Sequence, residues 1–216
     1  MVAIEASESA AILAFSVVLI IISMILAGIA DWYKREVPTV FWIPGVIGVA
    51  ISFLAFGMPR SLPAVVALTY IAYGTVIGAV VGVVYHLLTH GALGVADIIA
   101  FALAMPFLVM SWISFIVGAA VVWALVYYDA GPTLRHDVII EPNSSVARRD
   151  IPTKIVLPDG KTMVLPKNLK LAWQAAKAAP PGSDVYGRYA VPIVTILMGG
   201  VIATFIVLLA VAALIM

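Results

Sequence analysis

The chain contains no cysteine and few charged side chains. Of its 216 residues, 64% are hydrophobic and only 11% are Asp, Glu, Lys or Arg. The absence of cysteine excludes disulfide bonds, thiolate nucleophiles and cysteine-ligated zinc sites. Soluble domains average about 25% charged residues, and here the apolar residues also gather in long runs. This composition indicates a polytopic membrane protein in contact with the lipid bilayer.

Several sequence signals are also missing. No dense basic stretch with interleaved aromatic residues is present, so the sequence predicts no nucleic-acid partner. No glycine-rich cofactor motif, internal repeat or low-complexity tract is found. The first charges are Glu5 and Glu8, where a secretory leader would carry Lys or Arg. We therefore expect the run from Ala10 to Ala30 to be a permanent helix.

The apolar runs predict an all-α polytopic protein with about six transmembrane helices. Residues 1–128 carry five of them, residues 129–189 form a small cytoplasmic α/β insert, and residues 190–216 hold the last. The fourth and fifth spans are split because a helix of about 35 residues, with a rise of ~1.5 Å each, would be longer than the ~30 Å hydrocarbon core of the bilayer. The expected spans are Ser9–Ala30, Thr39–Phe56, Pro63–Leu88, Val95–Val109, Met110–Tyr128 and Ala190–Leu214.

The basic residues predict the orientation. With six spans and the N-terminus outside, Arg60 alone of the 12 Lys and Arg residues falls on the outer side. Cytoplasmic loops carry an excess of Lys and Arg, so this asymmetry favours the arrangement. The predicted inner residues are Lys34, Arg35, Arg135, Arg148, Arg149, Lys154, Lys161, Lys167, Lys170, Lys177 and Arg188.

The insert is predicted as a hairpin followed by a helix. The β-prone runs Thr153–Leu157 and Lys161–Leu165 flank Pro158-Asp159-Gly160, and Asp-Gly between such runs favours a hairpin. Asn168 could cap a helix over Leu169–Ala179, which Pro180 would stop. A hairpin and one helix bury little surface, so we expect this part to depend on the bundle or the membrane surface.

Two aspartates stand at the ends of apolar segments. Asp31 ends the first, and Asp97 opens a later one after the small-residue stretch Gly91–Ala96. Ionisable groups at membrane depth cost free energy and are candidates for a functional role. Each also has an ordinary explanation. Asp31 could form an ion pair with Lys34 or Arg35 in the lipid headgroup region. Asp97 could be a carboxylate in the first turn of a helix, where the helix dipole favours it.

Together, the two segments resemble the prepilin peptidase family of GxGD-type intramembrane aspartic proteases, and above all its archaeal preflagellin (archaellin) and type IV prepilin-like branch. That family places one catalytic aspartate just after the first span, before a basic stretch and a proline, as in Asp31–Pro38 here. Its second catalytic aspartate ends a Gly-x-Gly-Asp motif. Gly94-Val95-Ala96-Asp97 is similar, with Ala96 at the second glycine and Gly91 shortly before.

The resemblance implies a catalytic pair of Asp31 and Asp97 and a function in leader removal. The implied substrate is a preflagellin or prepilin-like precursor with a short basic leader followed by an apolar helix, cut at the cytoplasmic membrane boundary. The bacterial branch carries paired cysteines and an N-methyltransferase activity. Because this chain has no cysteine, we expect a peptidase without methylation, and we predict neither a cofactor nor a metal.

Other ionisable residues are harder to assign. Glu36, Asp129 or Asp137 could attract a basic leader. His86 and His90 lie one turn apart and could be metal ligands or an interfacial pair, and no third ligand recurs at a clear spacing.

Two other functions remain open. A small proton- or cation-coupled transporter could use Asp31 and Asp97 as a relay. A non-catalytic assembly protein could bind a cytoplasmic partner through its basic loop, in which case both aspartates would be dispensable.

Overall fold

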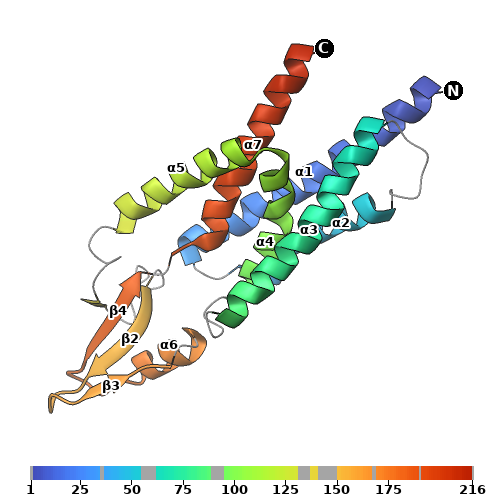
Figure 1. The fold of residues 1–216 in the computed structure, drawn as a ribbon. Coiled ribbons are helices and arrows are strands. Elements are labelled where there is room, and N and C mark those ends of the chain that lie inside the picture. Colours follow the sequence, from blue (N-terminus) through green and yellow to red (C-terminus); the bar gives the residue numbers. More distant parts are fainter. Residues whose placement is uncertain are drawn as a thin grey trace. The chain divides into compact units, whose positions relative to one another are not determined.

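The computed structural model describes residues 2–34, 37–54, 62–88, 95–130, 137–140, 150–166, 169–189 and 191–215 (Figure 1). The chain divides into two compact units. We call one the helical unit (Met1–Asp31, Glu36–Trp123 and Ile193–Met216) and the other the sheet unit (Trp32–Arg35 and Ala124–Pro192).

The described chain is mostly helical, and four of its helices are long and apolar enough to cross a membrane. These four segments are Ala10–Tyr33, Val65–Leu88, Trp112–Ala130 and Ile193–Leu214, and two shorter apolar stretches are Thr39–Leu54 and Val95–Met110. The polytopic helical class is thereby supported, and the shorter stretches correspond to the second and fourth expected spans. The elements are α1 (Val2–Lys34), η1 (Thr39–Trp42), α2 (Ile43–Leu54), α3 (Leu62–Leu88), α4 (Val95–Met110), α5 (Trp112–Ala130) and α7 (Ile193–Ile215).

The predicted division of the apolar run 95–128 into two helices is confirmed. α4 ends at Met110 and α5 begins at Trp112, so the helix is interrupted at Ser111. The Ser111 N–H still donates to the Phe107 carbonyl at 3.0 Å, and the Ser114 hydroxyl lies 2.6 Å from the Ser111 hydroxyl. Pro106 stays inside α4 and is fully buried. The serine side chains therefore mark the helix boundary, and the proline does not.

Three glycines one turn apart bring α3 against α4. A Cβ on Gly74 would lie 2.7 Å from Pro106 Cα, and one on Gly78 would lie 2.3 Å from the Phe101 carbonyl oxygen. A Cβ on Gly82 would lie 3.0 Å from Ile98 Cα. Small residues at this spacing let helix backbones approach closely in membranes. The motif Gly74-x-x-x-Gly78-x-x-x-Gly82 thus fixes the position of α4 against α3. α4 is the helix whose first turn holds Asp97.

Residues from α1, α4 and α7 share one buried core. α1 contributes Ile20, Met24 and Ala27, α4 contributes Ala100, Leu103, Ala104 and Phe107, and α7 contributes Val194 and Val201. Two further glycines tighten this packing, because a Cβ on Gly28 would lie 2.5 Å from Met198 Sδ and one on Gly118 would lie 2.3 Å from the Gly199 carbonyl oxygen.

The sheet unit is more than the expected hairpin and helix. Its four antiparallel strands are β1 (Val138–Ile139), β2 (Asp150–Val156), β3 (Thr162–Val164) and β4 (Asp184–Tyr189), in the order β1-β4-β2-β3. Helix α6 (Leu169–Lys177) packs on β2. β1 and β4 were not predicted from the sequence. They complete a separate apolar core of Ile140, Ile155, Leu165, Ala172, Ala176 and Val185.

The predicted hairpin itself is confirmed. β2 and β3 pair antiparallel, with Ile155 opposite Met163, and Gly160 has the positive φ (80°) that the turn requires. The Lys161 backbone N–H and its ammonium group hydrogen-bond to the Asp159 carboxylate, and these bonds hold the pKa of Asp159 below its usual range. The expected helix is present as α6, whereas its proposed cap Asn168 lies outside the described residues.

Candidate active site

Asp31 lies near the end of α1 and is buried. Only 7% of the residue is exposed, although it is charged in its ordinary state. Its Oδ2 atom accepts a hydrogen bond from the Thr195 backbone N–H at 3.2 Å, and the Thr195 hydroxyl lies 3.4 Å from the same oxygen. The same hydroxyl lies 2.7 Å from the Gly28 carbonyl oxygen, one turn before Asp31. Asp31 is thus joined to α7 across 164 positions of sequence.

The position of Thr195 explains this contact. Thr195 is the third residue of α7, and the first N–H groups of a helix have no partner within the helix. A carboxylate placed there satisfies such an N–H and interacts favourably with the positive end of the helix dipole. The sequence predicted Lys34 or Arg35 as the partner of Asp31 and gave no sign of Thr195. The Lys34 side chain and Arg35 lie outside the described part of the chain.

Asp97 is the third residue of α4 and is partly exposed. Its position in the first helical turn matches the ordinary explanation of a carboxylate at a helix N-terminus. The neighbouring Ala96, Ile99 and Ala100 pack into the core that also holds Ala27 of α1. The α4 segment that bears Asp97 therefore joins the same core as the last turns of α1.

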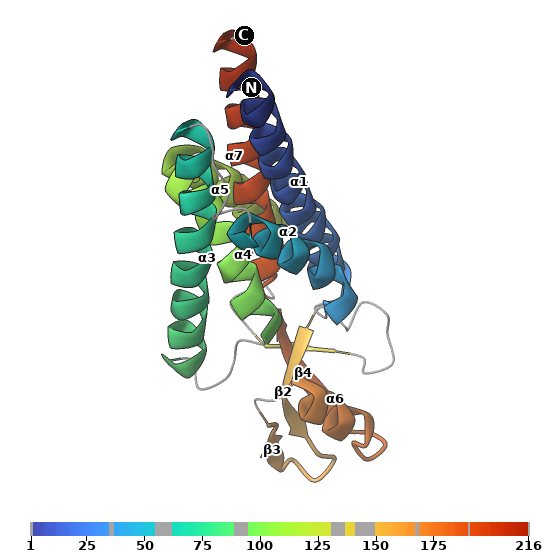
Figure 2. The ribbon, with the colours of Figure 1, turned by 90° about the vertical axis from the view of Figure 1, so that its right-hand side faces the viewer.

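The two aspartates come from helix ends on one side of the helical unit. Figures 1 and 2 show, from two directions, the C-terminal end of α1 and the N-terminal ends of α4 and α7 at the same end of the helices. The N-terminus of α1 and the C-terminus of α7 lie at the other end. Residues 66 positions apart in sequence are thereby brought to one end of one folded unit.

The glycine motif before Asp97 is described only in part. Gly91 and Gly94 lie outside the described residues, whereas Ala96 is helical and half-buried. The glycines that the structure shows in close helix contacts are others, notably those of α3. Their spacing of four residues was visible in the sequence and could have been recognised.

The histidines add no metal centre to the described part of the chain. His86 is half-buried near the end of α3, and His90 lies outside the described residues. Within the described ranges no three His, Asp or Glu side chains gather as metal ligands.

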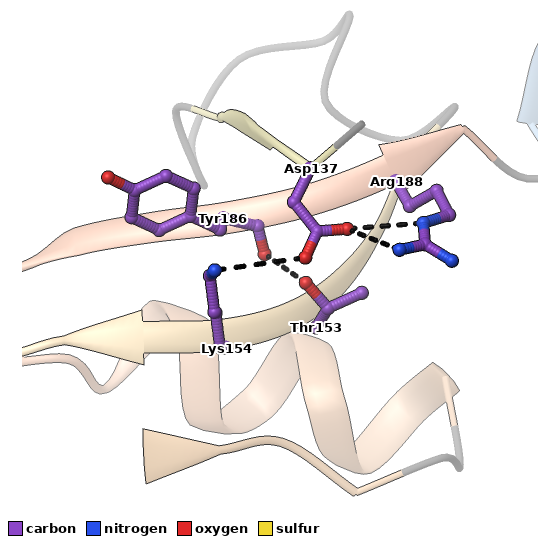
Figure 3. A network of polar contacts seen from close by, with 5 residues as sticks. All are labelled: Asp137, Thr153, Lys154, Tyr186 and Arg188. Atoms are coloured by element: carbon purple, nitrogen blue, oxygen red, sulfur yellow. Dashed lines mark hydrogen bonds and ion pairs between the residues drawn. The ribbon is translucent and has the colours of Figure 1, made fainter. Parts of the chain in front are cut away.

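Two acidic residues of the sheet unit, Asp129 and Asp137, have partners within that unit. The Tyr189 hydroxyl donates to Asp129 Oδ2 at 3.1 Å. Asp137 accepts from Arg188 at 3.1 Å and lies 4.0 Å from the Lys154 ammonium, which also sits over the Tyr186 ring (Figure 3). Asp137 thus already has two cationic partners, which weakens its candidacy as a docking point for a basic leader. Glu36 lies outside the described residues.

An apolar groove of about 570 Å³ lies elsewhere in the helical unit. It is lined by residues of α1, α3, α4 and α7, among them Val17, Tyr70, Met110 and Leu208. Val17 precedes Asp31 by 14 residues, which is about 21 Å along a helix. The groove is therefore separate from the end of the unit that carries the aspartates.

Comparisons of the chain with protein-family models, curated proteins and solved structures found no match. The likeness to a peptidase family therefore depends on the residues around Asp31 and Asp97 themselves.

Proposed function

We propose that the chain is a membrane-embedded aspartic endopeptidase that removes the short basic leader from preflagellin or type IV prepilin-like precursors. One observation carries the proposal. Asp31 lies near the C-terminal end of α1 and Asp97 near the N-terminal end of α4; the two helices share a core, and these two ends lie at the same end of the helical unit. Two carboxyl groups that meet are sufficient for acid–base hydrolysis of an amide, and this shared end of the helices supports such a meeting.

In the proposed mechanism, the two carboxyl groups share one proton. Two adjacent carboxylates cannot both ionise cheaply, so one is neutral and the pair titrates as a unit. The ionised member takes a proton from a water molecule, whose oxygen attacks the scissile carbonyl carbon. The neutral member gives its proton to the carbonyl oxygen. When the C–N bond breaks, the leaving amine takes up the proton that the base received, and one hydroxyl of the diol returns its proton to the other carboxylate, which restores the singly protonated pair.

The proposal includes a topology. α2 with η1 and α4 would be two further, shorter membrane segments, giving six spans with the last turn of α1 and the first turn of α4 on the cytoplasmic side. The unequal distribution of Lys and Arg supports this orientation. A cytoplasmic site suits a substrate whose basic leader remains inside while its apolar helix enters the bilayer.

The first experiment is a cleavage assay with the purified chain in liposomes. The substrate is a synthetic peptide with a basic leader followed by an apolar segment, and mass spectrometry identifies the products. We expect one cut at the junction between leader and apolar segment. A chelator should leave the rate unchanged, because the carboxyl pair activates water without a metal.

The same liposomes distinguish the transporter alternative. That alternative predicts a proton or cation flux that disappears when Asp97 is replaced, and no peptide product. Flux without cleavage would reject the peptidase, and cleavage without flux would reject the relay. An assembly protein would show neither activity.

A further inference from the structure

We propose that Thr195 is a positioning residue that fixes the carboxyl group of Asp31 for proton transfer. The inference rests on the proposed peptidase function. Thr195 lies on α7, outside the aspartate pair and outside the sequence segments around the two aspartates. Thr195 touches no substrate atom in this proposal and acts only through Asp31.

The geometry joins three groups at one point. The Thr195 N–H donates to Asp31 Oδ2 at 3.2 Å, and the Thr195 hydroxyl lies 3.4 Å from that oxygen and 2.7 Å from the Gly28 carbonyl oxygen. Thr195 is only 4% exposed, so water competes little for these contacts. One carboxyl oxygen of Asp31 is therefore held by both the backbone and the side chain of a single residue.

The hydroxyl can serve Asp31 in both of its protonation states. A hydroxyl has one proton to donate and two lone pairs to accept with. The shorter contact of the Thr195 hydroxyl is to the Gly28 carbonyl oxygen, so the hydroxyl donates its proton there. A lone pair of the hydroxyl oxygen is then available to accept from a protonated Asp31. If Asp31 is ionised, the hydroxyl can rotate and donate to it instead. The carboxyl group thus keeps a partner in each state that the reaction visits.

Close helix packing keeps Thr195 in this position. Gly28 has no side chain, and a Cβ placed on it would lie 2.5 Å from Met198 Sδ. α7 therefore approaches α1 closely one turn before Asp31, and Thr195 lies one turn before Met198. A catalytic group held by a packed, hydrogen-bonded neighbour keeps the geometry that proton transfer requires.

The test compares Thr195→Val, which keeps the shape and loses the hydroxyl, with Thr195→Ser, which keeps the hydroxyl. We expect Thr195→Val to lower kcat by about 10- to 100-fold, the equivalent of one hydrogen bond to a charged group, with KM nearly unchanged. Thr195→Ser should restore kcat. Thr195→Ala replaces the valine variant if the latter does not fold.

Thr204→Val is the matched control on the same helix. Thr204 is fully buried, and its hydroxyl lies 3.3 Å from the Ser114 hydroxyl. This variant removes a buried hydroxyl from α7 at a distance from Asp31, so kcat should stay at the wild-type value. A loss of kcat in Thr204→Val equal to that in Thr195→Val would mean that any damage to α7 slows the enzyme, and it would overturn the proposal.

A second measurement does not depend on cleavage. Dicyclohexylcarbodiimide modifies carboxyl groups in membranes, and mass spectrometry reports the rates at Asp31 and Asp97 separately. A carboxyl group that has lost a hydrogen-bond partner reacts faster, so Thr195→Val should raise the rate at Asp31 by about tenfold. Thr195→Ser and the rate at Asp97 should match the wild type.

The outcomes separate the two proposals. A wild-type kcat or a wild-type labelling rate at Asp31 in Thr195→Val overturns the role of Thr195, even if the aspartate variants are inactive. If the wild-type chain cleaves no leader peptide, the peptidase proposal fails, and the labelling alone decides whether Thr195 holds Asp31.

Discussion

Replacing either aspartate by asparagine is expected to remove leader cleavage while the fold survives. Asparagine is isosteric with aspartate but cannot exchange a proton, and positioned acid–base groups contribute about 10²- to 10⁴-fold to a rate. We therefore expect Asp31→Asn and Asp97→Asn each to lower kcat/KM by at least about 10²-fold. The rate of product formation by mass spectrometry checks this result.

The structure provides a sharp control for this experiment at position 31. The Asp31 carboxylate accepts from the Thr195 N–H, and an asparagine carbonyl oxygen can accept the same bond. Asp31→Asn should therefore keep the link to α7, whereas Asp31→Ala should lose it and cost about 1 kcal/mol of stability. If Asp31→Asn is fully active and only Asp31→Ala is damaged, Asp31 is a helix cap and not a catalytic acid.

Adding a single methyl group to Gly78 is expected to destabilise the helical unit. Gly→Ala inside an exposed helix normally stabilises it by about 1 kcal/mol. At Gly78 the new Cβ would lie 2.3 Å from the Phe101 carbonyl oxygen and 2.8 Å from Met105 Cβ. Both atoms belong to the middle of α4 and cannot move aside as the tip of a side chain could. The two helices must therefore separate, which should lower the free energy of unfolding by about 1–3 kcal/mol. The sign of the usual effect should thus be reversed.

The three glycines of α3 predict a graded series. The nearest atoms to the added Cβ lie at 2.3, 2.7 and 3.0 Å for Gly78, Gly74 and Gly82. Stability in detergent, followed by chemical denaturation, should fall most for Gly78→Ala and least for Gly82→Ala. Val80→Leu, on an exposed position of the same helix, is the matched control and should be neutral. A Gly78→Ala chain more stable than the wild type would contradict the close α3–α4 contact.

Much of the fold could be predicted because apolar runs and turn residues are local signals. The long apolar runs predicted the four long helices, and the Asp159-Gly160 pair predicted the hairpin between β2 and β3. β1 and β4 were missed for a physical reason. β1 has two residues, and β4 contains Gly187, so neither carries a strong β pattern, and only pairing across the sheet stabilises them.

In the candidate site too, the residues with a local sequence signal could be predicted, and those defined by contacts between distant segments could not. Asp31 and Asp97 stand out in sequence because acids are costly beside apolar runs. Thr195 does not, since threonine is ordinary in such a helix and its partner lies 164 positions away. The spacing of Gly74, Gly78 and Gly82 could have been recognised, but only the structure identifies α4 as the helix that they contact.

The most direct test of the central claim is whether positions 31 and 97 meet. The chain has no native cysteine, so Asp31→Cys and Asp97→Cys can be combined without further changes and treated with a short bifunctional thiol reagent in membranes. A Tyr85→Cys and Phe101→Cys pair, whose native rings lie 6.2 Å apart, is the positive control. A Val17→Cys and Asp31→Cys pair, about 21 Å apart along α1, is the negative control. We predict a cross-link between positions 31 and 97 in high yield, and a failure to link them while the positive control reacts would contradict a shared catalytic site.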